Sequence, residues 1–362
     1  MAAVRKYSTP PHCPRRDCDS HANPGKWRFK KKGFYVRSGT PRAIQRYLCQ
    51  HCQRSFSSQT FSTTYWLKRP ELQLPLFWRL LACSALRQIA HELGTTHATL
   101  QRQAERLGRH CLLFHERLRP APRETLVLDG LRTFEAGQYW PFDLNVLVGR
   151  SHFIYGFNEA ELRRSGTMTA VQKRRRAQLE ARYGRPEPQA TRHAVAELVG
   201  RVVPEGTSAR IDSDEHQAYP RAFRRLQDRT IEHQTTSSKA SRTARNPLFA
   251  ANLADLLLRH TGANHKRETI AFSKRRQSAM YRAAIFVVWR NYVKWSSERR
   301  KTPPPAVTLG LTARRLSVEQ ILGRRLFPWR LNLEGWLRQC YYGRIRTRSI
   351  RRCTMHRLTY AE

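Results

Sequence analysis

Three carboxylates stand within one short turn of a strongly basic chain. Residues 208–220 read SARIDSDEHQAYP, so Asp212, Asp214 and Glu215 lie between a predicted strand and a predicted helix. A second acidic position, Asp129, closes the apolar run LVLD at 126–129, and we expect it to follow a strand directly. If the two strands are neighbours in one sheet, Asp129 and Asp214 meet at its edge, where like charges repel unless a cation lies between them.

Carboxylate oxygens are the hard ligands that Mg²⁺ prefers. Two Mg²⁺ ions about 4 Å apart activate a water or a 3′-hydroxyl on one side of a phosphate and stabilise the leaving oxygen on the other. Asp129 and Asp214 therefore predict magnesium-dependent phosphoryl transfer. The alternative is that turns simply favour Asp.

Four of the eight cysteines form two pairs near the N-terminus. Four residues separate Cys13 from Cys18, two separate Cys49 from Cys52, and thirty lie between the pairs. This spacing is typical of a zinc ribbon, in which four thiolates surround one structural Zn²⁺. Nearby histidines leave a Cys₃His site open as an alternative: His12, His21 and His51. The other cysteines are expected to be small core or surface residues: Cys83, Cys111, Cys340 and Cys353.

A helix-turn-helix is predicted for residues 86–107, LRQIAHELGTTHATLQRQAERL. Ile89, Ala90 and Leu93 form an apolar face on the first helix, Gly94 supplies the turn, and Thr95 or Thr96 can cap the second helix. The second helix is expected to turn these polar side chains toward a DNA major groove: Thr96, His97, Thr99, Gln101, Arg102 and Gln103. An ordinary helical hairpin within a larger core would show the same apolar pattern.

Strand-like periodicity begins after residues 117–124. The segments ETLVLDGLRTFE and WPFDLNVLVGRSHFIYGFN predict three strands, of which two form a hairpin. A basic and mainly helical stretch follows at 158–200. Next come the strand and helix around Asp214, a last strand in RTIEHQTT and a helix over 250–262. This order predicts an α/β fold.

The composition favours a polyanionic partner. The chain has 67 Lys and Arg against 27 Asp and Glu, a formal net charge of +40. Such a charge points to nucleic acid, although an arginine-favouring genome would also raise it. The longest apolar run, 283–289, is too short to span a bilayer, and the first residues have no apolar leader. We therefore expect a cytoplasmic protein with no membrane partner.

Taken in order, these motifs resemble one family. The zinc ribbon of this family is matched by the segments CPRRDC and RYLCQHCQRSFS. Its first catalytic acid is matched by LVLDG, its second by SDEHQAYP, and its third by residues 246–275. The chain resembles bacterial insertion-sequence transposases, which have an RNase H-like DDE catalytic domain behind a zinc ribbon and a helix-turn-helix. The resemblance implies a ribbon over 1–68, a helix-turn-helix region over 69–119, a catalytic domain over 120–300 and a basic C-terminal region over 301–362. A basic helical insertion is expected around 158–205.

The resemblance also implies the catalytic residues. The second acid of such enzymes precedes an Ala-Tyr pair by four or five residues, which selects Asp214 rather than Asp212. The usual third acid, a Glu seven residues before a basic residue, would fall on Asn252 if Arg259 is that basic residue. Asp255 is the carboxylate on the same helical face, with Arg259 placed to bind DNA phosphate. Glu268 keeps the seven-residue spacing and is the alternative third acid, but HTGANH is expected to end the helix before it.

The predicted function is therefore DNA transposition. Water activated by Mg²⁺ would cleave the ends of the element, and the freed 3′-hydroxyl would attack target DNA. The implied cofactors are one structural Zn²⁺ and two catalytic Mg²⁺. The implied partners are double-stranded DNA and further copies of the chain, within the bacterial nucleoid.

Two other interpretations stay open. The chain could be a non-catalytic DNA-binding regulator, or an inactivated copy of a transposase. The arginine-rich segment 338–362 is expected to clamp DNA and to be dispensable for the catalytic fold; a solvated basic tail is the alternative.

Overall fold

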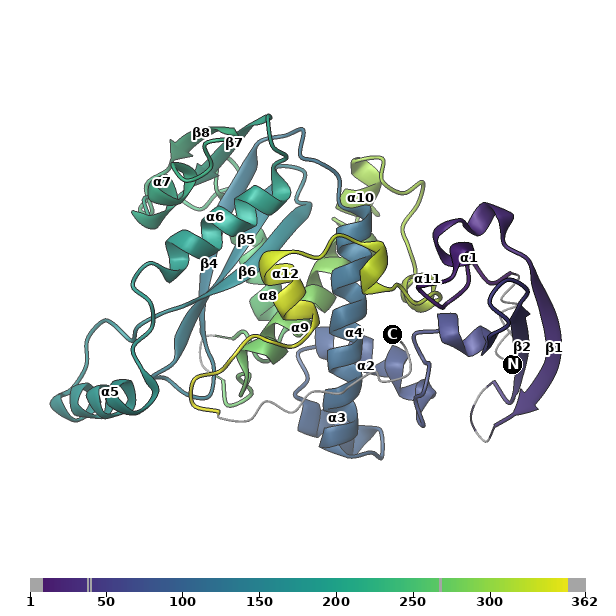
Figure 1. Cartoon of the computed structure of the whole chain (residues 1–362). Coiled ribbons are helices and arrows are strands. Elements are labelled where there is room, and N and C mark those ends of the chain that lie inside the picture. Colours follow the sequence, from purple (N-terminus) through teal and green to yellow (C-terminus); the bar gives the residue numbers. More distant parts are fainter. Residues whose placement is uncertain (1–8, 38, 40, 267–268, 351–362) are drawn as a thin grey trace.

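The N-terminal part is a small antiparallel sheet with two cysteine-bearing turns (Figure 1). The computed structural model describes residues 9–37, 39, 41–266 and 269–350. In the first part, a short helix and three strands follow one another: α1 (Asp19–Ala22), β1 (Phe29–Val36), β2 (Ala43–Cys49) and β3 (Ser55–Ser57). Strand β2 lies between the other two, and its Tyr47 packs on Phe56 in a small aromatic core.

Three helices connect this sheet to the rest of the molecule: α2 (Gln73–Leu81), α3 (Leu86–Glu92) and α4 (His97–Leu118). Ile89 and Leu100 are fully buried between them, as the apolar pattern predicted. Gly94 adopts a φ of +54° in the turn, a conformation that glycine enters without a Cβ penalty. The hydroxyl of Thr96 accepts a hydrogen bond from the backbone N–H of Thr99 and caps α4.

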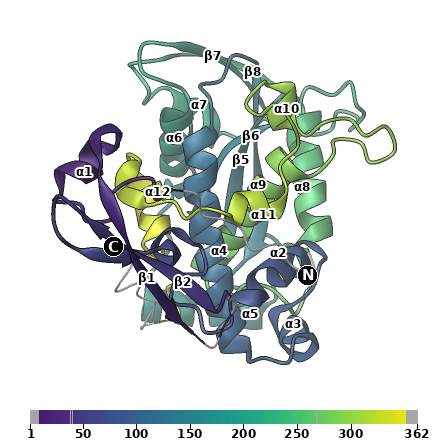
Figure 2. The same ribbon diagram turned by 90° about the vertical axis from the view of Figure 1, so that its right-hand side faces the viewer.

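Helix α4 is longer than the predicted second helix and runs through the centre of the molecule (Figure 2). It packs along α9 (Arg276–Val288), and the two backbones approach closely at Gly108. A Cβ on Gly108 would lie 2.3 Å from the Cβ of Tyr281. The helix that was expected to belong to a small DNA-binding unit is therefore also a core element of the main body.

The main body contains a mixed five-stranded sheet in the order β6-β5-β4-β7-β8. Its strands are β4 (Leu126–Phe134), β5 (Pro141–Gly149), β6 (Ile154–Glu161), β7 (Ser208–Ser213) and β8 (Thr230–Thr235). The β4–β5 and β5–β6 pairs are antiparallel, whereas β7 pairs in parallel with both β4 and β8. The predicted mixed α/β arrangement is confirmed. Every residue of β5 is buried, because helices cover both of its faces.

Two groups of helices cover the sheet. On one face, α6 (Ala190–Val202) packs against β5 and β6, and α7 (Ala218–Phe223) lies beside α6. On the other face, α8 (Phe249–Thr261) packs against β4 and β5, and α9 packs against β6. Helix α5 (Ala170–Tyr183) has no buried residue and projects from the body (Figure 1). The expected insertion at 158–205 thus contains one projecting helix, α5, and one core helix, α6.

The C-terminal region is folded into the body. After α9 come a π-helical turn over Trp289–Val293 and three short helices: α10 (Pro305–Thr308), α11 (Val318–Leu322) and α12 (Gly335–Tyr341). Trp336, Leu337 and Cys340 of α12 belong to the main hydrophobic core, and Thr347 donates a hydrogen bond to buried Glu135. Residues 338–350 are therefore packed into the body, which argues against the expectation that 338–362 is dispensable for the fold. Among the described residues, no helix is long and apolar enough to cross a membrane.

Candidate functional site

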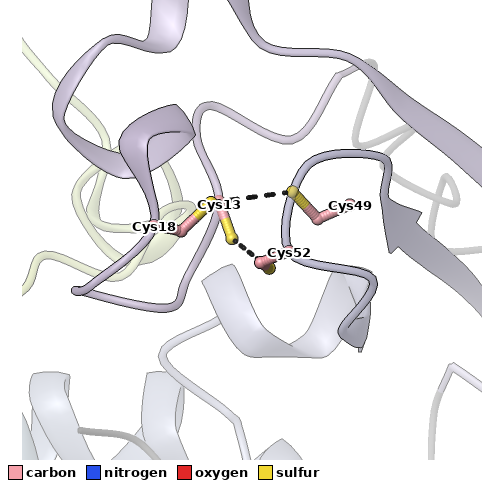
Figure 3. A group of neighbouring side chains, drawn as sticks. All are labelled: Cys13, Cys18, Cys49 and Cys52. Atoms are coloured by element: carbon pink, nitrogen blue, oxygen red, sulfur yellow. Dashed lines mark hydrogen bonds between the residues drawn. The ribbon is translucent and has the colours of Figure 1, made fainter.

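Cys13, Cys18, Cys49 and Cys52 converge between α1 and the β2–β3 turn (Figure 3). Their sulfur atoms all lie within 4.8 Å of one another, with 3.6 Å between Cys13 and Cys52 and 3.9 Å between Cys18 and Cys49. A tetrahedral Zn²⁺ with Zn–S bonds of about 2.3 Å would separate its thiolates by a similar distance. The cluster is therefore compatible with one structural zinc ion, as the spacing predicted.

The nearby histidines have other roles. The Nδ1 atoms of His12 and His21 both lie within hydrogen-bond distance of the Cys13 carbonyl, and His51 lies on the surface beside Asp19. Burial of Cys49 opposes ionisation of its thiol. Hydrogen bonds from the backbone N–H of Cys52 and from the Trp27 indole, which lies 3.4 Å from the sulfur, outweigh this effect of burial. The pKa of Cys49 is therefore lowered to about 6. The geometry favours four thiolate ligands over a Cys₃His set.

A distant segment completes the core of the ribbon. Phe327 belongs to the same buried cluster as the cysteines, and the Trp329 indole donates a hydrogen bond to Nε2 of His21. The guanidinium of Arg16 stacks 3.9 Å from the centre of the Trp329 ring. Sequence reasoning missed this packing because 308 residues separate His21 from Trp329.

Asp129 and Asp214 occupy adjacent positions on neighbouring strands. Val127 pairs with Asp212 and Leu128 with Ser213, so the same parallel register places Asp129 beside Asp214. Asp214 directly follows β7, as predicted. Asp129 does not end its strand, because β4 continues to Phe134 and pairs with β5 along that whole length.

Asp255 lies on α8, which packs against β4 beside these two acids. Helix α8 covers Phe249–Thr261, close to the predicted 250–262. One carboxylate oxygen of Asp255, Oδ1, is buried and has no hydrogen-bond partner in the described part of the chain. Glu268 lies outside the described residues, and α8 ends seven residues before it. We call Asp129, Asp214 and Asp255 the acidic site.

The electrostatics of the acidic site favour an added positive charge. Burial and the charge of Asp129 raise the pKa of Asp255 well above its usual value, although Arg259 and Arg242 oppose this. Burial, followed by the charge of Asp214, raises the pKa of Asp129. A bound cation would reverse both shifts, because it stabilises the ionised carboxylates.

Tyr219 and Gly130 add to the acidic site. A Cβ on Gly130 would lie 3.3 Å from the Tyr219 hydroxyl, so the glycine leaves room for the phenol beside β4. Burial raises the pKa of Tyr219, and the negative charges of Asp129 and Asp214 raise it further. The phenol therefore stays neutral and can donate a hydrogen bond next to the carboxylates.

A fourth carboxylate near the site, Asp143, was missed by sequence reasoning. It lies on β5 opposite Arg132, is almost fully buried, and has a raised pKa through that burial. Asn145 lies two residues further along the same face and donates a hydrogen bond to Asn158. Two polar residues at alternate positions of an otherwise apolar strand were the available signal.

The other two acids of the Asp214 turn have different environments. Asp212 is fully buried, and its carboxylate accepts a hydrogen bond from Arg150 at 2.9 Å and lies 3.5 Å from Arg210. Glu215 is exposed and accepts a hydrogen bond from the backbone of Ser238. The turn thus contains one structural acid, one exposed acid and one acid, Asp214, beside Asp129.

Within the described residues, the four cysteines are the only group of three or more side chains gathered closely enough to hold a metal ion. The acidic site does not form such a cluster, so the structure gives no support for the predicted magnesium ions. What it does supply is a pair of adjacent carboxylates and a third whose buried Oδ1 lacks a hydrogen-bond partner in the described chain.

The predicted DNA-contacting residues divide into two groups. Thr96, His97 and Arg102 are exposed, and Thr99 is half-buried at the start of α4. Gln101 is partly buried, and its side-chain amide donates hydrogen bonds to Glu105 and to Ser278 of α9. Gln103 is buried and donates to the backbone of Arg69, so its predicted outward orientation is wrong. Arg259 lies on α8, beside the acidic site instead.

Comparisons with known proteins add no assignment. No protein-family model matches the chain, and no curated protein is significantly similar to it.

Proposed function

We propose that this protein is a DNA transposase of the DDE type, which cleaves the ends of an insertion sequence and joins them to target DNA. One observation carries the proposal. In a chain of net charge +40, Asp129 on β4 and Asp214 directly after β7 lie side by side, and α8, which carries Asp255, packs against β4. Among the described residues, the ion pairs with Lys or Arg include Asp212 and Asp143 but none of these three acids.

The arrangement of elements agrees with an RNase H-like catalytic domain. Asp129 lies on β4 and Asp214 directly follows β7, the neighbouring parallel strand of a mixed sheet. The first helix after the last strand, α8, brings the third acid toward them, as expected for this kind of domain. The position of α8 supports Asp255 as the proposed third acid, whereas Glu268 lies outside the described residues.

Asp129, Asp214 and Asp255 would hold Mg²⁺, which when bound supplies an activated water or 3′-hydroxyl and stabilises the leaving oxygen. The residues fit such ions in charge and ligand type, and Mg²⁺ commonly binds through one or two carboxylates together with substrate phosphates. Formation of the full site would therefore accompany DNA binding. Arg259 would neutralise a phosphate oxygen, and the neutral Tyr219 would orient a carboxylate through its hydroxyl.

DNA recognition is proposed for the start of α4 and for the zinc ribbon. Four polar residues lie at the first turns of a helix that follows a glycine turn, which is compatible with the proposed helix-turn-helix: Thr96, His97, Thr99 and Arg102. Gln101 is better placed to hold α4 against α9 than to reach a base. The protein would act as a homo-oligomer that bridges two element ends.

The proposal can be tested by strand transfer with DNA from the sequences that flank the gene. Wild-type protein with Mg²⁺ should join these ends to a plasmid, and Asp129→Asn or Asp214→Asn should lower the rate at least about a thousandfold. Glu215→Gln is the matched control, because this neighbouring acid is exposed and outside the acidic site; it should retain activity. End binding should persist in all three variants.

A second candidate function is a non-catalytic DNA-binding regulator or an inactivated transposase. The failure of the three carboxylates to form a ligand cluster favours it. Wild-type protein that binds the element ends but never cleaves them in Mg²⁺ or Mn²⁺ would establish this candidate and refute the catalytic one.

A further inference from the structure

The zinc ribbon carries a large groove on its surface. The groove has a volume of about 980 Å³ and lies between the first cysteine turn, the three-stranded sheet and the segment 65–68 that leaves the ribbon. Six basic side chains line it: Arg15, Arg16, Arg37, Arg46, Arg54 and Lys68. Asp17 is the one carboxylate among its described lining residues, and it pairs with Arg15. The groove therefore has a strongly positive lining.

Aromatic rings lie among these cations. The side chain of Trp66 is 65% exposed and that of Tyr35 is 39% exposed, and both line the groove together with Tyr65. Large aromatic side chains are usually buried, so two exposed rings in one basic groove suggest a ligand with flat faces.

The backbone at Trp66 gives a second, independent observation. Trp66 has a φ of +59°, a left-handed conformation that is unfavourable for a bulky residue. Strain of this kind persists where the surrounding structure fixes it, and it is concentrated at binding sites. With this backbone conformation, Trp66 lines the groove and stays 65% exposed instead of packing in the ribbon core.

We propose that this groove binds single-stranded DNA. Cations along a groove neutralise the phosphates of a strand, and exposed rings stack on its unpaired bases. The bases of a duplex are already stacked on one another, so exposed rings would add little to duplex binding. This proposal rests on the proposed function only in taking DNA as the partner, because no groove residue belongs to the acidic site.

The test measures binding of full-length, zinc-loaded protein to labelled oligo(dT) by fluorescence anisotropy. An oligonucleotide of about 15 residues suffices for one such groove. Trp66→Ala should weaken binding by about 5- to 150-fold, which corresponds to the loss of one base stack. Trp66→Phe should retain most of the affinity, because it keeps a ring. Trp78→Ala is the matched control, since this ring is 41% exposed on α2, away from the groove.

Salt dependence tests the basic lining separately. Replacing Arg46 and Arg54 together with Gln should lower the slope of log affinity against log salt by about 1.4, at about 0.7 for each phosphate that is no longer neutralised. Zinc content and the melting curve of each variant show whether the ribbon is still folded.

Three results would overturn the proposal. The first is an unchanged oligo(dT) affinity in folded Trp66→Ala. The second is a duplex affinity that falls as much as the single-strand affinity. The third is tighter binding of oligo(U) than of oligo(dT), which would identify RNA as the ligand.

Asp129→Asn separates this proposal from the catalytic one. It should abolish strand transfer and leave oligo(dT) binding intact, because Asp129 lies on β4 of the main body and does not line the groove. Either proposal can therefore fail without the other.

Discussion

Asp255→Asn should make the protein more stable while removing its activity. Asp255 is half-buried, its buried Oδ1 has no hydrogen-bond partner in the described chain, and burial together with Asp129 raises its pKa well above 3.8. An ionised carboxylate in that position therefore costs stability at neutral pH. Asn keeps the shape of the side chain but carries no negative charge, so it removes the cost of an ionised group beside Asp129; a penalty of about 1–3 kcal/mol is usual for such a group, and we expect the free energy of unfolding at pH 7 to rise by about that amount.

The pH dependence has a definite sign. A carboxyl group whose pKa is higher in the folded state binds more protons in that state, so stability falls as pH rises from the unfolded pKa to the folded one. The gain in unfolding free energy from Asp255→Asn should reach its full size at pH values above the pKa of Asp255 in the folded protein. It should shrink as the pH falls toward 3.8. Denaturant titrations of both proteins in EDTA-treated buffer, at several pH values, measure this difference.

Added Mg²⁺ should reverse the order of stability. An ion that binds only the folded state stabilises it by about 2.7 kcal/mol at a hundred times its dissociation constant. Wild-type protein with bound DNA should gain this stability, and Asp255→Asn should gain much less. The reasoning would be refuted if the variant were less stable than wild type at pH 7 without Mg²⁺, or if both gained equally from Mg²⁺. Glu215→Gln is the control and should stay within about 0.5 kcal/mol of wild type.

Three further predictions concern the fold. Cys49→Ser should lose the zinc of the ribbon, measured by metal analysis, and expose the segment before residue 70 to protease; full zinc retention would contradict the four-thiolate site. Gly108→Ala should lower the free energy of unfolding by about 1–3 kcal/mol or more, because the added Cβ would meet Tyr281 at 2.3 Å, whereas Gly25→Ala, with nothing within 4 Å, should have little effect. A chain ending at residue 337 should lack a cooperative thermal transition, because it loses part of α12. A chain ending at residue 350 keeps every described element and should fold. If both chains melted at the same temperature, α12 would add nothing to the core.

Local patterns in the sequence predicted local structure well. The cysteine spacing predicted the cluster of four thiols, the glycine turn predicted the break between α3 and α4, and the apolar period predicted α8 to within one residue at each end. Each of these three features is determined by residues that are close to one another in the sequence or that meet in one short hairpin. The position of Asp214 after a strand was predictable for the same reason.

Packing between distant segments was not predictable in this way. Phe327 packs in the ribbon core, and α12 packs in the main core, although both belong to a segment whose composition suggests a basic tail. Arginine-rich composition hid the few apolar residues that carry this packing. Likewise, α4 continues to Leu118 because its second half is buried against α9, and no signal within α4 identifies that partner.

The acids of this basic protein differ in whether they have an arginine partner, and this difference carries the most information about function. Several buried acids in the main body have arginine partners: Asp212 pairs with Arg150, and Glu135 lies beside Arg276. In a chain with 67 Lys and Arg, a half-buried acid that lies outside every ion pair of the described residues stands out, because shielding its charge from water without a partner is costly. Asp129 and Asp255 are in this condition, and their raised pKa values reflect it. An apolar residue or an arginine partner would serve a purely structural role better, so the unpaired acids are candidates for a functional role; under the proposed function, a cation that arrives with the DNA would neutralise them.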